Sequence, residues 1–173
     1  KSSKQGASYA MNVNAFRHLY EYHFTENRHI WDSYVMQLSD EQFAQNMAYS
    51  HGSVRDQIVH LMSVDELWFN ELQGVELAAP FPAATIDDRN VIRAHWDNVE
   101  QTMRAYLAAL QDELLFAKPI QEPEEDKNLI VWQVMLHVVN HGTDHRAQLL
   151  RSLNDLGVKT LSQDYIFYVY DHS

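Results

Sequence analysis

The chain contains no cysteine among its 173 residues. It can therefore form no disulfide and no thiolate metal site, and it has no nucleophilic thiol of its own. Basic residues are scarce, since 13 Lys and Arg stand against 24 Asp and Glu and give a formal net charge of −11. Nucleic acids and anionic membranes are bound through clustered Lys and Arg. The composition thus argues against both kinds of partner.

Long apolar runs are also missing, because no stretch approaches the roughly 20 apolar residues of a membrane span. The segment that opens the chain, KSSKQGASYA, lacks the apolar stretch of a secretory signal. We expect residues 1–11 to be a tail, native or added for expression, ahead of a single domain at residues 12–173. The absence of cysteine is compatible with the cytoplasm, which is the location that we expect.

Helical periodicity is the main signal that the chain does carry. Apolar residues recur every three or four positions in long stretches that predict helices at about residues 12–38, 53–73, 87–113 and 129–156. Ser53 is the expected N-cap of the second helix, and Gly74 follows its end. Ser39 with Gln42 predicts the cap of a short extra turn after the first helix.

No segment alternates over a length that would build a sheet. Helices of this length predict an all-α fold, an antiparallel four-helix bundle. The segments GVELAAPFPAAT and KPIQEPEEDKN predict long loops after helices two and three. The final segment, TLSQDYIFYVYDHS, predicts a short C-terminal helix that packs its aromatic residues onto the bundle.

Histidines recur every four residues in the fourth helix, at His137, His141 and His145. Four residues advance about 6 Å along a helix, so the three face one side and two neighbours can chelate one ion. His137 and His145 are about 12 Å apart along the axis, which is too far to share an ion with metal–nitrogen bonds of about 2.1 Å. A third ligand must therefore come from another helix. His60 lies among apolar residues of the second helix, where an unsatisfied imidazole is costly to bury.

Spacing alone leaves two interpretations open for these histidines, namely metal binding and hydrogen-bonded core packing. The other histidines are expected at the surface or in loops: His18, His23, His29, His51, His95 and His172. A di-iron carboxylate centre needs Glu-x-x-His on two helices, and the chain offers this pair only at Glu26 and His29. No serine stands in the strained turn of a hydrolase triad, and no glycine-rich phosphate loop is present.

Segments of three helices resemble the DinB/YfiT-like family of bacterial four-helix-bundle proteins: NRHIWDSYVMQLSDEQF, GSVRDQIVHLMSVDELWF and HVVNHGTDHRAQLL. The likeness covers most of the chain, and NHGTDHRAQ is its most specific part. The resemblance implies a divalent metal held by His60, His141 and His145. His137 would then line the pocket or support a ligand, although its pairing with His141 as the ligands stays open.

Three imidazoles leave a fourth tetrahedral position open, as in catalytic zinc sites. The resembling family includes thiol-dependent transferases and isomerases. The resemblance therefore implies a metal-dependent enzyme, either a transferase that uses a small thiol cosubstrate or a hydrolase acting on a small molecule. The alternative is a non-catalytic metal-binding or stress-response bundle protein. Zinc is the first choice of ion, with nickel, iron and manganese as alternatives, and the resemblance also implies a homodimer, which light scattering can test.

Several polar residues are candidates for supporting roles. Asp56 lies one turn before His60 and could orient its ring, whereas Asp144 precedes a ligand candidate directly and diverges from it. Asn27 falls on the apolar stripe of the first helix, where it could bond a ligand histidine, the substrate or a neighbouring helix. Arg146 is expected at the surface or at an interface. The tryptophans that could line an apolar pocket or fill the core are Trp31, Trp68 and Trp132.

Overall fold

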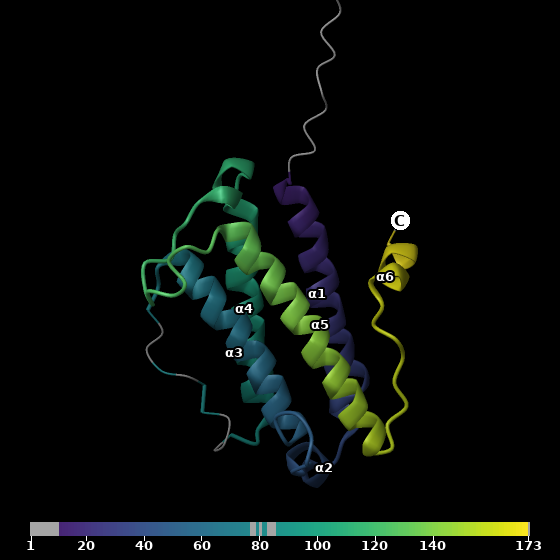
Figure 1. The fold of residues 1–173 in the computed structure, drawn as a ribbon. Helices are drawn as coiled ribbons and strands as arrows, with labels where there is room; N and C mark the ends of the chain where they lie inside the picture. The colour runs from purple at the N-terminus through teal and green to yellow at the C-terminus, as the bar shows by residue number, and fades with distance from the viewer. Residues whose placement is uncertain (1–10, 77–78, 80, 83–85, 173) are drawn as a thin grey trace, which may run out of the picture.

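The computed structural model describes residues 11–76, 79, 81–82 and 86–172, so the predicted tail lies outside the described residues except for Met11. The described part is helical and contains no strand, which confirms the all-α class (Figure 1). The long helices are α1 (Val13–Ser33), α3 (Val54–Gln73), α4 (Arg89–Ala109) and α5 (Val131–Asp155). The short elements are η1 (Val35–Gln37), α2 (Asp40–Ala44), η3 (Asp112–Phe116) and α6 (Tyr165–Asp171).

The helix boundaries follow local capping chemistry. Ser39 and Gln42 form the predicted capping box at the start of α2, and the Ser53 side chain accepts a backbone hydrogen bond at the start of α3. Gly74 ends α3 in the left-handed region with φ of 64°, a conformation that glycine adopts without strain. α1 ends at Ser33, earlier than predicted, because the chain turns there into η1.

Contacts between the long helices give the direction in which each one runs. Val13 at the start of α1 donates its backbone N–H to Asp112, just after α4, at 2.8 Å. Arg28 near the end of α1 pairs with Glu100, inside α4, at 3.0 Å. α1 and α4 are therefore antiparallel, and Figure 1 shows that α3 and α5 are antiparallel as well.

The remaining neighbours run in the same direction. Tyr20 donates to the backbone oxygen of Met135, and further along both helices Asn27 bonds Arg146, so α1 and α5 are parallel. α3 and α4 are also parallel, because Arg55 near the start of α3 pairs with Asp87 just before α4, and further along both helices the Phe69 ring lies 5.4 Å from that of Tyr106. The predicted antiparallel arrangement is thus not confirmed as a whole, since two of the neighbouring pairs of long helices are parallel.

Apolar side chains fill the space between the long helices. Ile58, Met62, Met135 and Leu149 are completely inaccessible to solvent. α6 is the predicted short C-terminal helix, but Tyr168 is its one buried residue. Among the described helices, none combines the length and the apolar character that a membrane span requires.

A buried polar network joins α1, α3 and α5. Arg146 is completely inaccessible, and its Nη1 donates to Asn27 Oδ1 at 3.0 Å and to His23 Nδ1 at 3.1 Å. Because arginine can only donate, His23 Nδ1 is the acceptor and the ring proton sits on Nε2. Nε2 then donates to Asp65 Oδ2 at 3.0 Å. Asn27 Nδ2 lies 3.1 Å from the same Nε2, which in this tautomer is a contact without a hydrogen bond.

Gly142 permits this network, because the His23 ring lies directly against the backbone of α5. A Cβ at Gly142 would lie 2.4 Å from His23 Cε1 and 2.6 Å from its Nδ1. No side chain fits at such distances, so glycine is required here for close approach. Gly142 stands between His141 and His145, and the contact that holds α1 against α5 therefore also fixes the turn that carries both histidines.

Two predictions about single residues are wrong. The sequence places His23 at the surface or in a loop and Arg146 at the surface or an interface, but both are fully buried. Burial is tolerated because each polar group finds a partner: besides its bonds within the network, Arg146 Nε donates to Gln163 Oε1 at 2.8 Å.

Replacing Gly142 by alanine tests the close approach of His23. Helix propensity alone predicts that Gly142→Ala stabilises the protein by about 1 kcal/mol. The clash with His23 predicts instead a loss of about 1–3 kcal/mol in the free energy of unfolding, as in other overpacked cores. Urea denaturation gives the sign, and Asn140→Ala at an exposed position of α5 is the control, expected to be neutral or slightly stabilising. A Gly142→Ala protein at least as stable as wild type would contradict the described contact.

Candidate metal centre

α3 and α5 bring together three candidate histidines. His60 Nε2 lies 3.1 Å from His141 Nε2, and the two ring centroids are 5.0 Å apart. The His145 ring is 4.5 Å from that of His60 and 4.2 Å from that of His141. All three side chains are partly buried. Two antiparallel helices thus present three imidazoles to one another from opposite sides.

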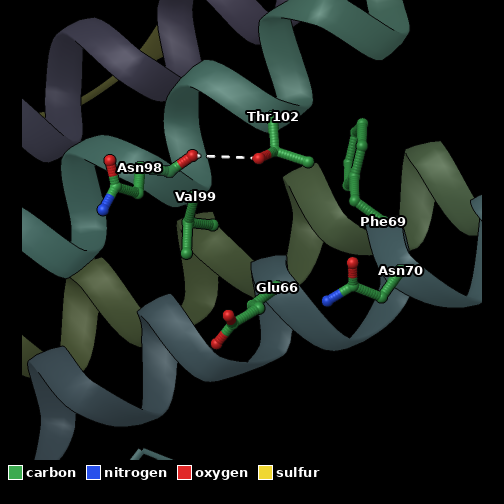
Figure 2. A pocket seen from close by; sticks show the side chains of 6 residues that line it. All are labelled: Glu66, Phe69, Asn70, Asn98, Val99 and Thr102. Carbon is green, nitrogen blue, oxygen red and sulfur yellow. Dashed lines mark hydrogen bonds between the residues drawn. The ribbon is translucent and has the colours of Figure 1, made fainter. Parts of the chain in front are cut away.

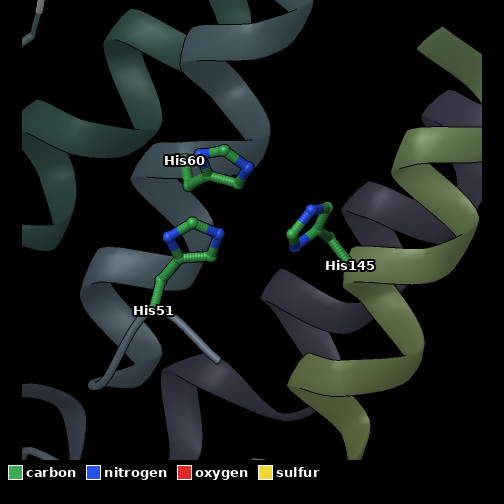
Figure 3. Close-up of side chains that lie close together, drawn as sticks. All are labelled: His51, His60 and His145. Atoms are coloured by element: carbon green, nitrogen blue, oxygen red, sulfur yellow. The ribbon is translucent and has the colours of Figure 1, made fainter. Parts of the chain in front are cut away.

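A fourth histidine joins this group from outside the helices. His51 lies in the turn before α3, and its ring stacks on that of His60 with centroids 3.8 Å apart and an interplanar angle of 21°. Figure 3 shows the rings of His51 and His60 facing His145 across the gap between α3 and α5. One nitrogen from each of these three histidines lies within 4.8 Å of the other two. We call His51, His60, His141 and His145 the histidine cluster.

The dimensions of the histidine cluster fit a single metal ion. Two nitrogens that each lie about 2.1 Å from one ion are at most about 4.2 Å apart. The 3.1 Å between His60 and His141 is within this limit, whereas the 4.8 Å span of His51, His60 and His145 is slightly beyond it and requires their side chains to move together. The Nδ1 atoms of His141 and His145 are buried and have no hydrogen-bond partner among the described residues. Unpaired nitrogens are unfavourable in a packed core, so hydrogen bonds among the described residues do not fully satisfy these two imidazoles.

The environment also holds the imidazoles in the neutral form that binds metals. Burial, together with the nearby His51 and His145, lowers the pKa of His60 from 6.5 to about 4. Burial and the neighbouring histidines, led by His145, lower the pKa of His141 to about 3. Burial also lowers the pKa of His145. Protons therefore compete weakly for these nitrogens at neutral pH.

The predicted pocket-lining residues lie at the edge of the cluster. His137 is exposed, with its ring 5.8 Å from that of His141, and the Trp68 ring stands edge-on to it at 5.4 Å. Trp68 and Trp132 are partly buried, whereas Trp31 belongs to the core. Of the three tryptophans predicted to line a pocket or fill the core, Trp68 is the one with a described ring contact to a histidine of α5, namely His137.

The polar residues predicted to support a ligand are engaged elsewhere. Asp56 accepts a hydrogen bond from Arg55 Nε at 2.9 Å. Asn27 accepts one from the buried Arg146 at 3.0 Å. The hydrogen bonds described for these two residues include none to the histidine cluster.

Helical spacing could not detect that His51 joins the cluster. The sequence places His51 at the surface or in a loop, and it does lie exposed in a turn. Ser50 with φ of 52° and Gly52 with φ of 89° fold that turn back toward α3. The available signal is local: a histidine beside a glycine, directly before the N-cap Ser53 of the helix that carries His60.

A separate cavity of ≈ 80 Å³ lies between α3 and α4 (Figure 2). Its lining residues are Glu66, Phe69, Asn70, Asn98, Val99 and Thr102. Glu66 is paired with His95 Nε2 at 2.9 Å, and the Thr102 hydroxyl donates to the Asn98 backbone oxygen at 3.1 Å. This cavity contains no member of the histidine cluster, and we assign the candidate site to the α3–α5 side.

The fold and the cluster together define an all-helical protein with a histidine-rich candidate metal centre. The model of the DinB family matches residues 11–172, and the chain therefore belongs to that family, as its motifs indicate. It is similar to Protein DinB of Bacillus subtilis (strain 168), with 25% identity over 167 residues that cover 92% of this chain and 96% of that protein.

The lowered pKa values predict how the stability of the metal-free protein depends on pH. Above pH 6.5 both the folded and the unfolded chain hold His60 and His141 neutral, so these groups have no effect there. As the pH falls below 6.5, the unfolded chain binds protons that the folded chain excludes until about pH 4 at His60 and about pH 3 at His141. The free energy of unfolding must fall through this range.

Urea denaturation in a chelator, at several pH values between 7 and 4, measures this dependence. We expect the wild type to lose stability more steeply than the double variant His60→Gln/His141→Gln, which has no imidazoles to protonate at these positions. Equal losses in both proteins would contradict the assigned pKa values.

Proposed function

We propose that this DinB-family protein is a metal-dependent enzyme whose divalent ion is held by His60, His141 and His145. The observation that carries the proposal is the 3.1 Å approach of His60 Nε2 and His141 Nε2 from two different helices. His141 and His145 each bury an Nδ1 atom without a hydrogen-bond partner among the described residues, and such unpaired polar atoms are costly to the fold. A shared ion would offset that cost, because metal binding to the folded state contributes folding free energy.

The donor set favours zinc. Neutral imidazoles suit zinc, nickel and iron, whereas manganese prefers oxygen ligands that the cluster does not offer. Three histidines leave one tetrahedral position open, and an ion there supplies Lewis acidity to a ligand at that position. The protein keeps the imidazoles neutral and holds them at the α3–α5 contact. Trp68 and His137 contact each other at the edge of the histidine cluster.

The absence of cysteine narrows the chemistry that we propose. A reaction that needs a sulfur nucleophile requires a low-molecular-weight thiol as cosubstrate, since the chain has none of its own. Transfer of such a thiol to a small electrophilic substrate is therefore our first proposal, and hydrolysis of a small molecule is the second enzymatic one.

A non-catalytic metal-binding or stress-response role is the competing proposal, and one observation favours it. General acid or base catalysis needs a titratable group within hydrogen-bond reach of the reacting atoms. The carboxylates nearest in sequence to His60 and His145 have other partners. Asp56 accepts a hydrogen bond from Arg55, and Asp144 accepts one from Gln148 at 3.0 Å. Turnover that depends on the metal decides between the two roles.

Metal content is the first test of the proposed centre. Protein purified without a nickel column is reloaded with zinc, desalted and measured by elemental mass spectrometry as wild type, the double variant His141→Ala/His145→Ala, and His137→Ala. We expect about one zinc per chain in the wild type, loss of zinc in the double variant and retention in His137→Ala, because the His137 ring lies outside the cluster. Zinc retained by the double variant, or absent from the wild type, would contradict the proposed ligands.

Thermal unfolding and turnover separate the remaining possibilities. An ion that binds only the folded state must raise the melting temperature, so a chelator should lower it in the wild type and leave the double variant His141→Ala/His145→Ala unchanged. A screen of small thiols with electrophiles should then give turnover that rises with zinc loading. Zinc binding without any turnover would favour the non-catalytic role, and unchanged melting with chelator would leave the histidines as core residues.

A further inference from the structure

We propose that His51 is an exchangeable fourth ligand that closes the metal centre until a substrate sulfur displaces it. This inference rests on the proposed metal site and concerns its regulation. His60, His141 and His145 come from helices, whereas His51 comes from a turn and is the exposed member of the cluster. Four imidazoles saturate a tetrahedral ion, and three leave it open. The position of His51 therefore determines whether the centre can accept a further ligand.

The contacts of His51 place its nitrogens among those of the other ligands. Its ring lies 3.8 Å from that of His60 in a stack and 5.2 Å from that of His145. Stacking sets the ring edges of His51 and His60 side by side, and both edges face His145 (Figure 3). Because nitrogens that share one ion are at most about 4.2 Å apart, the 4.8 Å span of the three nitrogens requires the rings to move closer together before they share an ion.

The turn that carries His51 is tied to the helix that carries His145. Ser50, the preceding residue, donates its hydroxyl to Gln148 of α5, and Gln148 in turn donates to Asp144 at 3.0 Å. On the other side, Gly52 adopts φ of 89°, and a Cβ there would lie 2.8 Å from Asn46 Oδ1. The turn is thus shaped for close approach, with His51 held over the gap between the two helices.

Exposure distinguishes His51 from the other three ligands in a way that suits exchange. The Nδ1 atoms of His141 and His145 are buried without a hydrogen-bond partner among the described residues, whereas the exposed His51 ring can be solvated when it is not a ligand. Its release would cost one ligand bond, and the freed ring could take up its stack on His60. A small thiol that bound in its place would give up its proton to solvent.

Paired substitutions at His51 separate a ligand from a stacking partner. His51→Phe keeps an aromatic ring that can stack on His60 but offers no nitrogen donor, whereas His51→Asn removes the ring. Zinc affinity is measured by competition with a chromogenic chelator, with His137→Ala as the control. We expect both His51 variants to bind one zinc about tenfold or more weakly than wild type and His137→Ala to match it.

Cobalt as a spectroscopic probe reports the exchange itself. Cobalt-loaded wild type and His51→Phe are titrated with 2-mercaptoethanol, and sulfur binding is followed by its charge-transfer absorption. Because His51 competes with the thiol for one position, His51→Phe should bind the thiol at a concentration about tenfold lower than wild type.

Each outcome bears on one proposal. Equal zinc affinity in His51→Phe and wild type, or equal thiol midpoints, would overturn the role of His51 while leaving the three-histidine centre intact. A wild-type protein that binds neither zinc nor cobalt would overturn the proposed metal centre itself, which the His51 comparison alone cannot do.

Discussion

The position of the histidine cluster depends on one buried contact, the seating of the His23 ring against the backbone of α5 at Gly142. Arg146 holds that ring from one side and Asp65 from the other, and each belongs to a different helix from His23. Burying an arginine and a carboxylate is unfavourable unless their polar groups are bonded, so the network adds little net stability. The network instead fixes the relative positions of α1, α3 and α5 along their lengths.

That register explains why the cluster lies on the α3–α5 side. Gly142 and Arg146 alternate along α5 with His141 and His145, so one side of the helix turn contacts α1 while the neighbouring side faces α3. The residues that pack against α1, Gly142 and Arg146, thus directly follow the two histidines that could bind a metal, His141 and His145.

The sequence predicts the parts of this arrangement that depend on helical period. The spacing of His141 and His145, and the need for a ligand from another helix, follow from a rise of about 1.5 Å per residue. Three features do not follow from period. His51 is brought in by a turn, the burial of His23 and Arg146 depends on partners from other helices, and the parallel pairs of helices are visible only in contacts between distant parts of the chain.

Anomalous diffraction at the zinc edge from crystals of the zinc-loaded protein is the decisive test of the proposed metal centre. If these three histidines hold the ion, we expect one strong anomalous peak between α3 and α5, within about 2.1 Å of nitrogens from His60, His141 and His145. A peak at any other position, or none between these helices in crystals that contain zinc, would contradict it.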